Sequence, residues 1–181
     1  MNWIEYLQLN NEALGSIPIE VVEEFTEKLI QVRDIGGKVW VLGNGGSAST
    51  ASHAVGDFGK TSKLNGARPL FSIAPSEMTA LQTAYANDES FESAMSSTLR
   101  DFLAKDDAVW VISVSGRSPN LIAALDVAKE IGALTLATVG SRGAVMADSV
   151  DVGVCINSDD YQVVENAQLI LMHWFTKSLQ A

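Results

Sequence analysis

Short apolar runs rich in β-branched residues alternate along this chain with segments of helical character. The runs are apolar throughout, which is typical of parallel strands that are covered on both faces. This alternation predicts a doubly wound α/β domain, in which helices cover both faces of a five-stranded parallel sheet. The expected strands are 39–42, 69–73, 108–114, 134–139 and 150–156.

The intervals between the runs predict the helices. The final one is expected to be capped by Asp159 or Asp160. Before the first strand, Val22, Phe25 and Leu29 recur at helical spacing until Gly36 and Gly37 end the pattern. The 181 residues are therefore expected to form a single domain, with an N-terminal helical segment (1–36) and an α/β core (37–181). The other expected helices are 47–58, 79–103 with a break near Asn87, 119–131, a short piece at 143–147, and 161–179.

Acidic residues outnumber basic ones by 22 to 12, for a formal net charge of -10. A field of this sign repels phosphate polymers, which argues against direct binding of nucleic acid or of anionic membranes. No apolar run approaches the roughly 20 residues that span a bilayer, and the start of the chain lacks the pattern of a signal peptide. A cytoplasmic protein is expected, with the single cysteine, Cys155, as a buried structural thiol.

Two of the expected strands end in loops of similar chemistry. GNGGS (43–47) follows the first strand, and SVSGRSPN (113–120) follows the third. Glycines let a ligand approach the backbone, helix starts present unpaired N–H groups, and serines add neutral donors, so an acidic protein can bind phosphate there. Each loop alone is equally well explained by ordinary turn and cap preferences. Their joint presence at strand ends favours a phosphate site.

A dinucleotide site is the alternative for the first loop, because Gly43, Gly45 and Ala48 fit a loose G-x-G-x-x-A pattern. That fingerprint requires an acidic residue about 20 residues further on, to bind the ribose. Residues 61–75 contain no acid, and the next one is Glu77. The sequence therefore predicts no nucleotide cofactor.

The chain has two histidines, His53 and His173. Asp57 follows His53 at i+4 on the same helical face, a pair that can bind a metal, carry protons or form an ordinary surface contact. His173 lies among bulky apolar residues of the final helix, where a histidine is more often part of the core. Glu165 precedes it by eight residues, on roughly the same side of that helix.

Together these segments resemble the SIS (sugar isomerase) domain family. The resemblance is carried by GNGGS, by S-x-x-x-H (49–53) with an acid four residues later, and by S-x-S-G-x-S (113–118). It is closest to the phosphoheptose (sedoheptulose 7-phosphate) isomerases and extends over nearly the whole chain. The resemblance implies the SIS fold and an aldose–ketose isomerase of sugar phosphates.

The same resemblance implies roles for individual residues. Asp57 and His173 correspond to the proposed base and acid. A tentative zinc site would comprise His53, Asp57, Glu165 and His173. The residues implied to contact the sugar phosphate are Asn44, Gly45, Gly46, Ser47, Asn87, Asp88, Ser113, Val114, Ser115, Ser118 and Glu165.

Three positions depart from the phosphoheptose isomerase pattern. Asp57 is one methylene shorter than the family's glutamate, Glu165 replaces a glutamine, and Val114 replaces a threonine. These changes leave the heptose substrate open. They also give weight to an alternative, a non-catalytic SIS module that binds a sugar phosphate or a protein partner, of the replication-initiator-associating or regulatory type.

The spacing of Glu165 and His173 indicates whether one subunit alone could form the metal site. Eight residues separate them by about 12 Å along a helix, so one metal would reach both of these side chains in a single copy only if both were fully extended. Residues from neighbouring subunits would reach it more easily. We therefore predict a homo-oligomer, as in the tetramers of such isomerases, with its active sites at subunit interfaces.

Overall fold

The computed structural model describes residues 1–180, and its centre is one parallel sheet of five strands. The spatial order is β2-β1-β3-β4-β5, and every neighbouring pair is parallel, as the sequence predicted. The strands are β1 (Val39–Leu42), β2 (Ser72–Ile73), β3 (Ala108–Ser113), β4 (Leu134–Gly140) and β5 (Val152–Ile156).

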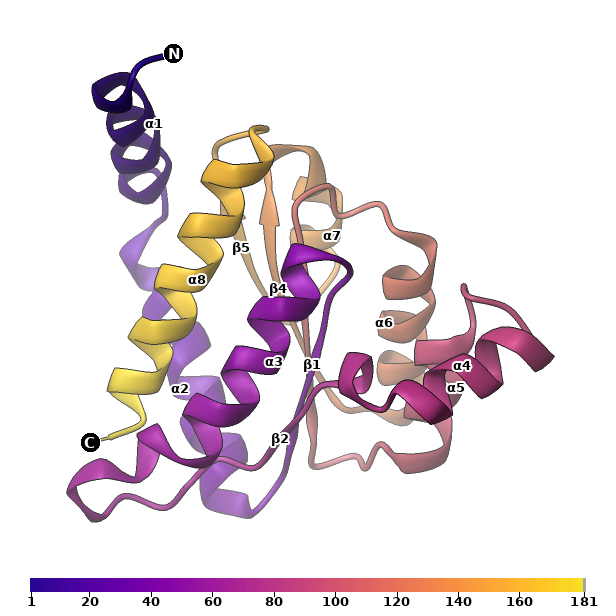
Figure 1. Cartoon of the computed structure of the whole chain (residues 1–181). Helices are drawn as coiled ribbons and strands as arrows, with labels where there is room; N and C mark the ends of the chain where they lie inside the picture. The colour runs from indigo at the N-terminus through magenta and orange to yellow at the C-terminus, as the bar shows by residue number, and fades with distance from the viewer. Residues whose placement is uncertain (181) are drawn as a thin grey trace.

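Helices cover both faces of this sheet (Figure 1). One face carries α1 (Trp3–Gly15), α2 (Ile19–Ile35), α3 (Gly46–Gly59) and α8 (Tyr161–Ser178). The other carries α5 (Ala94–Phe102), α6 (Pro119–Ile131) and α7 (Ala144–Asp148), and α4 (Thr79–Asp88) packs against α5. Within residues 1–180 there are also three 3-10 helices: η1 (Thr61–Gly66), η2 (Pro75–Glu77) and η3 (Ser141–Gly143).

The central strands are apolar at every position because they contribute to two cores. In β1, Val39 and Val41 face the core under α2, α3 and α8, whereas Trp40 and Leu42 face the core under α5 and α6. On the first face the ring of Phe25 stacks on that of Phe175, with centroids 4.6 Å apart. Both faces of the sheet are thus closed by aromatic and aliphatic packing.

The edge strands differ most from their predicted bounds. Only Ser72–Ile73 of the second run pairs with β1, and that run begins with a proline, which has no N–H to donate to a ladder. At the other edge β5 begins at Val152, because the side chain of Asp151 accepts hydrogen bonds from the backbone N and the Oγ1 of Thr135.

The prediction that Cys155 is buried was wrong in degree. Burial alternates along β5, as expected of an edge strand, and Cys155 is partly exposed. Burial, and then the charge of Asp148, raise the pKa of its thiol, which disfavours the thiolate. A structural thiol remains the consistent interpretation.

The N-terminal segment contains two helices where the sequence pattern indicated one, because α1 precedes α2. Asn2 caps α1 through a capping box with Glu5. Asp160, one of the two predicted caps of α8, accepts hydrogen bonds from the backbone N of Gln162 and of Val163. Within residues 1–180, no helix combines the length and the apolar character that a membrane crossing requires.

The strand order places a topological switch point between β1 and β3. The chain leaves β1 toward β2 on one side, and β3, β4 and β5 follow on the other. In open parallel sheets, ligands bind beyond the carboxyl ends of the strands at such a point. Here α3 begins just after β1 and α6 just after β3, so two helix N-termini meet at this edge.

Candidate functional site

A pocket of about 140 Å³ lies at the switch point, and we refer to it as the serine pocket. It joins the two loops that the sequence singled out, one after β1 and one after β3. Its lining residues are Asn44, Ser47, Ile112, Ser113, Val114, Ser115, Ser118, Leu121, Tyr161 and Glu165.

Glycine makes the first loop of the pocket possible. Gly45 has a φ of +54°, a conformation that favours glycine. A Cβ on Gly43 would lie 2.6 Å from the backbone carbon of Ser47, so only glycine lets α3 start this close to the strand. No side chain caps the first turn of α3, which leaves its N-terminal end available to an anion.

In the second loop the backbone orients the serine hydroxyls. The backbone N of Gly116 donates to Ser113 Oγ at 3.0 Å, and that of Arg117 donates to Ser115 Oγ at 3.3 Å. Because both oxygens accept from the backbone, their own protons remain to donate to a ligand. Ser118 is the N-cap residue of α6, and its side chain makes no capping bond. These hydroxyls suit an anion with several acceptor oxygens.

Glu165 brings a carboxylate into the same pocket. A Cβ built on Gly46 would lie 2.4 Å from Glu165 Oε1, so the carboxylate packs directly against the first residue of α3. A negative charge is favourable at a helix N-terminus. Glu165 therefore lines the same pocket as the serines of the second loop, and its charge is of the sign that opposes an anion there.

His53, Asp57 and His173 form a second group, which we call the His–Asp cluster. Asp57 Oδ2 lies 3.8 Å from His53 Nε2 and 3.9 Å from His173 Nε2. The two imidazole rings meet edge to face, with centroids 5.0 Å apart. Helices α3 and α8 run side by side from the same edge of the sheet (Figure 1), and this brings residues 53 and 173 together within one chain.

The His–Asp cluster could hold a metal ion. One ligand atom from each of the three residues lies within 4.8 Å of the others. Two imidazoles and a carboxylate are zinc ligands, and catalytic zinc sites commonly use three protein ligands and keep one position open. Of the four residues predicted to bind metal, Glu165 does not join this group within the chain and lies about two helical turns from His173.

Thr61 is a contact that the sequence analysis missed. Its Oγ1 donates to Asp57 Oδ1 at 3.1 Å, which leaves Oδ2 to face both imidazoles. Gln180 Nε2 in turn donates to the carbonyl oxygen of Thr61 at 3.2 Å. Thr61 follows Asp57 by four residues but lies in η1, beyond the end of α3, so helical periodicity did not indicate the pair.

Two predicted substrate contacts lie elsewhere in this chain. Asn87 and Asp88 end α4, a helix with no buried residue, and Asn87 Nδ2 donates to Asp88 Oδ1 at 2.8 Å. Neither residue lines the serine pocket. Val114, which replaces the family's threonine, does line it and is buried.

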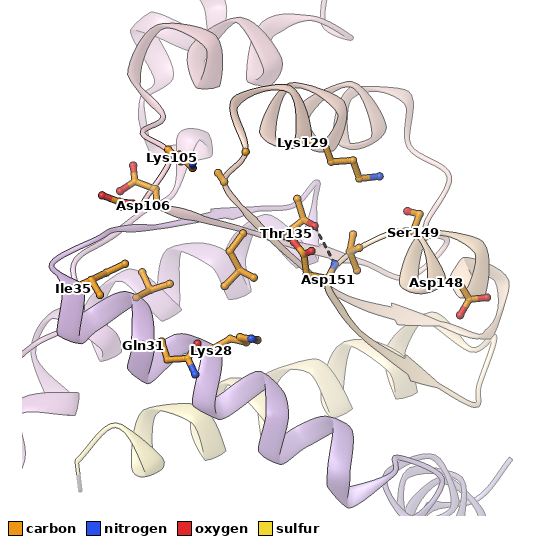
Figure 2. Close-up of a pocket in the computed structure, with 16 residues that line it drawn as sticks. Lys28, Gln31, Ile35, Lys105, Asp106, Lys129, Thr135, Asp148, Ser149 and Asp151 are labelled. Carbon is orange, nitrogen blue, oxygen red and sulfur yellow. Dashed lines mark hydrogen bonds between the residues drawn. The ribbon is translucent and has the colours of Figure 1, made fainter.

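A larger cavity of about 670 Å³ lies at the opposite, amino edge of the sheet (Figure 2). Lysines such as Lys28 and Lys129 and acids such as Asp106 and Asp148 line it together. Helices α2, α6 and α7 end there, and helix C-termini disfavour anions. Of the lysines, Lys129 lies in the last turn of α6, where a cation is favourable. The smaller serine pocket, with two helix N-termini, is the better anion site.

Comparisons with known proteins agree with this geometry. The family model described as SIS domain matches residues 11–140. A probable phosphoheptose isomerase of Thermoplasma volcanium is 33% identical over 174 residues, which cover 96% of this chain and 88% of the relative. A phosphoheptose isomerase of Trichlorobacter lovleyi is 37% identical over 153 residues, which cover 84% and 77% of the two chains.

Among solved structures, the phosphoheptose isomerase GmhA from Neisseria gonorrhoeae superposes with a TM-score of 0.86 at 26% identity. The match covers 98% of this chain and 94% of that one. The sugar isomerase domain of an RpiR transcription factor from Sphaerobacter thermophilus matches with a TM-score of 0.65 at 17% identity, over 96% and 86% of the two chains. At that identity the second likeness is one of fold alone.

Proposed function

The chain belongs to the SIS domain family, and we propose that it is a phosphosugar isomerase that interconverts the aldose and ketose forms of a sugar phosphate. We infer the class of its substrate from the phosphoheptose isomerases that it resembles. The observation that carries this proposal is the placement of a His–Asp cluster and a serine-lined anion pocket along the same pair of helices. We also propose that residues 1–181 form a single SIS domain, with 1–36 as its N-terminal helical segment.

The serine pocket would bind the phosphate group. Ser113, Ser115 and Ser118 would donate hydroxyl protons, and the N-terminal ends of α3 and α6 would add their favourable partial charge. The carbonyl end of the sugar would then extend along α3 and α8. Ser47 and His53 are six residues apart, or about 9 Å along the axis of α3, which favours a long-chain sugar phosphate over a triose phosphate.

The His–Asp cluster would carry the protons of the reaction. Asp57 Oδ2 would remove the proton from the carbon next to the carbonyl, and His173 Nε2 would protonate the carbonyl oxygen. The product of these two transfers is an enediol. Return of a proton to the former carbonyl carbon, and loss of one from the neighbouring hydroxyl, would give the isomer. Thr61 holds Asp57 Oδ1, so the reacting oxygen is fixed between the imidazoles.

Zinc is the metal that this donor set fits, and His53, Asp57 and His173 would be its ligands in one chain. The acid and base roles given above to His173 Nε2 and Asp57 Oδ2 would hold where these atoms do not bind the metal, because a nitrogen that ligates zinc carries no proton to donate. A bound zinc ion supplies Lewis-acid polarisation of the carbonyl oxygen. Glu165 would then act in the serine pocket, unless a neighbouring subunit brings its own copy of this carboxylate to the cluster.

We further propose that the sites are completed at subunit interfaces of a homotetramer. The His53 and His173 side chains are 47% and 44% exposed in the single chain. Exclusion of bulk water strengthens electrostatic interactions and protects a reactive enediol from side reactions, and a neighbouring subunit would provide it. The cytoplasmic location stays a prediction.

The function is tested by assaying isomerisation of a panel of aldose and ketose phosphates of three to seven carbons. We expect one long-chain member to be turned over with a kcat/KM of about 10⁴ M⁻¹s⁻¹ or more. The matching sugars without phosphate serve as controls and should react far more slowly. Thermal stabilisation by several sugar phosphates without turnover of any would instead establish the non-catalytic binding module.

Replacing Glu165 with glutamine is expected to tighten binding of inorganic phosphate about tenfold, because it removes a like charge from the serine pocket while preserving shape. Isothermal calorimetry measures the effect directly. Glu92→Gln, an exposed residue outside the pocket, removes the same net charge and serves as the control. Equal affinities of the Glu165→Gln and Glu92→Gln variants would show that this carboxylate does not oppose the anion.

A further inference from the structure

Two asparagine side chains join the loops of the serine pocket through a reciprocal amide pair. Asn44 Nδ2 donates to Asn120 Oδ1 at 3.0 Å, and Asn120 Nδ2 donates to Asn44 Oδ1 at 2.9 Å. Asn44 belongs to the loop after β1, and Asn120 is the second residue of α6. They are 76 positions apart in the sequence, so this is a tertiary contact across the switch point.

Asn120 is 2% exposed and does not line the pocket itself. Its Nδ2 also lies 3.8 Å from Met95 Sδ of α5, so the amide is held on both sides. Asn44 does line the pocket, but its Oδ1 and one of its two amide protons are already hydrogen-bonded to Asn120. Only one proton of the Asn44 side chain remains for a ligand.

The pair fixes two helix ends that would otherwise repel each other. Helices α3 and α6 both point their N-termini at the serine pocket, and each N-terminus carries a partial positive charge. These charges disfavour close approach, and the carboxylate of Glu165, which packs against Gly46 at the start of α3, offsets part of that repulsion. A neutral amide pair with both hydrogen bonds made holds the two ends at a fixed separation without adding charge of its own.

We propose that Asn120 is a positioning residue, which through Asn44 sets the separation of the two donor loops and so determines the affinity of the site for phosphate. The inference rests on the proposed use of the serine pocket as a phosphate site. Asn44 then acts mainly as a partner of Asn120, and its direct contact with the substrate is secondary.

A double-mutant cycle on phosphate affinity tests this assignment. The probe is inorganic phosphate, whose Kd is measured by calorimetry for the wild type, Asn44→Ala, Asn120→Ala and the double variant. We expect each single change to weaken binding about tenfold, and the double variant to be no weaker than the worse single one, because both remove the same contact. In the isomerase assay, Asn120→Ala should raise KM far more than it lowers kcat.

Thr135→Val is the matched control. It removes the hydroxyl of a buried residue at the opposite edge of the sheet, which donates to Asp151 Oδ2 at 2.7 Å and accepts from the backbone N of Asp151 at 3.1 Å. It should lower the Tm without changing the Kd for phosphate. A role of Asn120 in stability alone would give the same pattern, a lower Tm with an unchanged Kd, and would overturn the proposal.

Two other outcomes also contradict it. If Asn44 contacts the anion independently, the two single effects will add in the double variant. If the wild type binds no inorganic phosphate, the pocket is not the anion site on which the inference rests. Phosphate binding without turnover of any sugar phosphate would refute the proposed enzyme while leaving the role of Asn120 intact.

Discussion

An Asp57→Asn variant is expected to lose about a thousandfold in kcat for sugar phosphate isomerisation. Asparagine keeps the size of the side chain and can still accept the hydrogen bond from Thr61 Oγ1. It has no basic oxygen, however, to take a proton from the carbon next to the carbonyl. The Oδ2 position that faces both imidazoles would become either an amide NH₂ or a weakly basic carbonyl oxygen.

The measurement is the steady-state kcat of the variant on the substrate that the panel identifies, together with its metal content. Asp34→Asn, on the exposed surface of α2, removes the same charge and should retain wild-type turnover. Asp57→Glu, which keeps the carboxylate, should retain far more activity than Asp57→Asn. Turnover of Asp57→Asn within a few-fold of wild type, at equal metal content, would remove this carboxylate from the chemistry.

A Gly116→Ala variant is expected to lose about 3 kcal/mol of folding free energy, and with it the phosphate affinity of the serine pocket. Gly116 has a φ of +60°, which is strained for alanine. The added Cβ would also lie 2.5 Å from the Cα of Gly143, a backbone atom that cannot move aside by rotating a side chain. Relief of this clash would displace the loop whose amides orient Ser113 and Ser115.

Chemical denaturation and phosphate calorimetry measure the two effects. Gly56→Ala is the matched control, because Gly56 lies inside α3 and a Cβ there meets no atom within 4 Å. It should raise stability by about 0.5–1 kcal/mol, the usual gain from alanine at a helical glycine. An unchanged free energy of unfolding for Gly116→Ala would mean that the contact between Gly116 and Gly143 is loose in solution.

Local patterns predicted most of the fold. The bounds 39–42 and 119–131 agree with β1 and α6, because their own residues specify both elements. The strand is apolar and buried on both faces, and the helix begins with Pro119 and ends before Gly132. The edge strands were predicted too long, since their ends depend on which neighbour is present to pair with. Even there, the parallel direction of the strands followed from the alternation of strands and helices.

Most residues of the candidate site could be predicted individually, but which of them lie together in space could not. The serines of both loops reached one pocket because strand ends in a parallel sheet share an edge. The meeting of His53 with His173 was implied only by family resemblance, and no local pattern indicated it. The packing of Glu165 on Gly46 and the Asn44–Asn120 pair join residues far apart in sequence, which no periodicity can reveal.

Helices α3 and α8 start at the same edge and share a direction, and this has a consequence for how specificity can evolve. If the proposed roles hold, moving the His–Asp cluster one helical turn along both helices would shift the site of proton transfer by about 5.4 Å, while the serine pocket stayed in place. Substrate length in such a scaffold is therefore adjustable in discrete increments, each requiring only a few exchanges on two exposed helical faces.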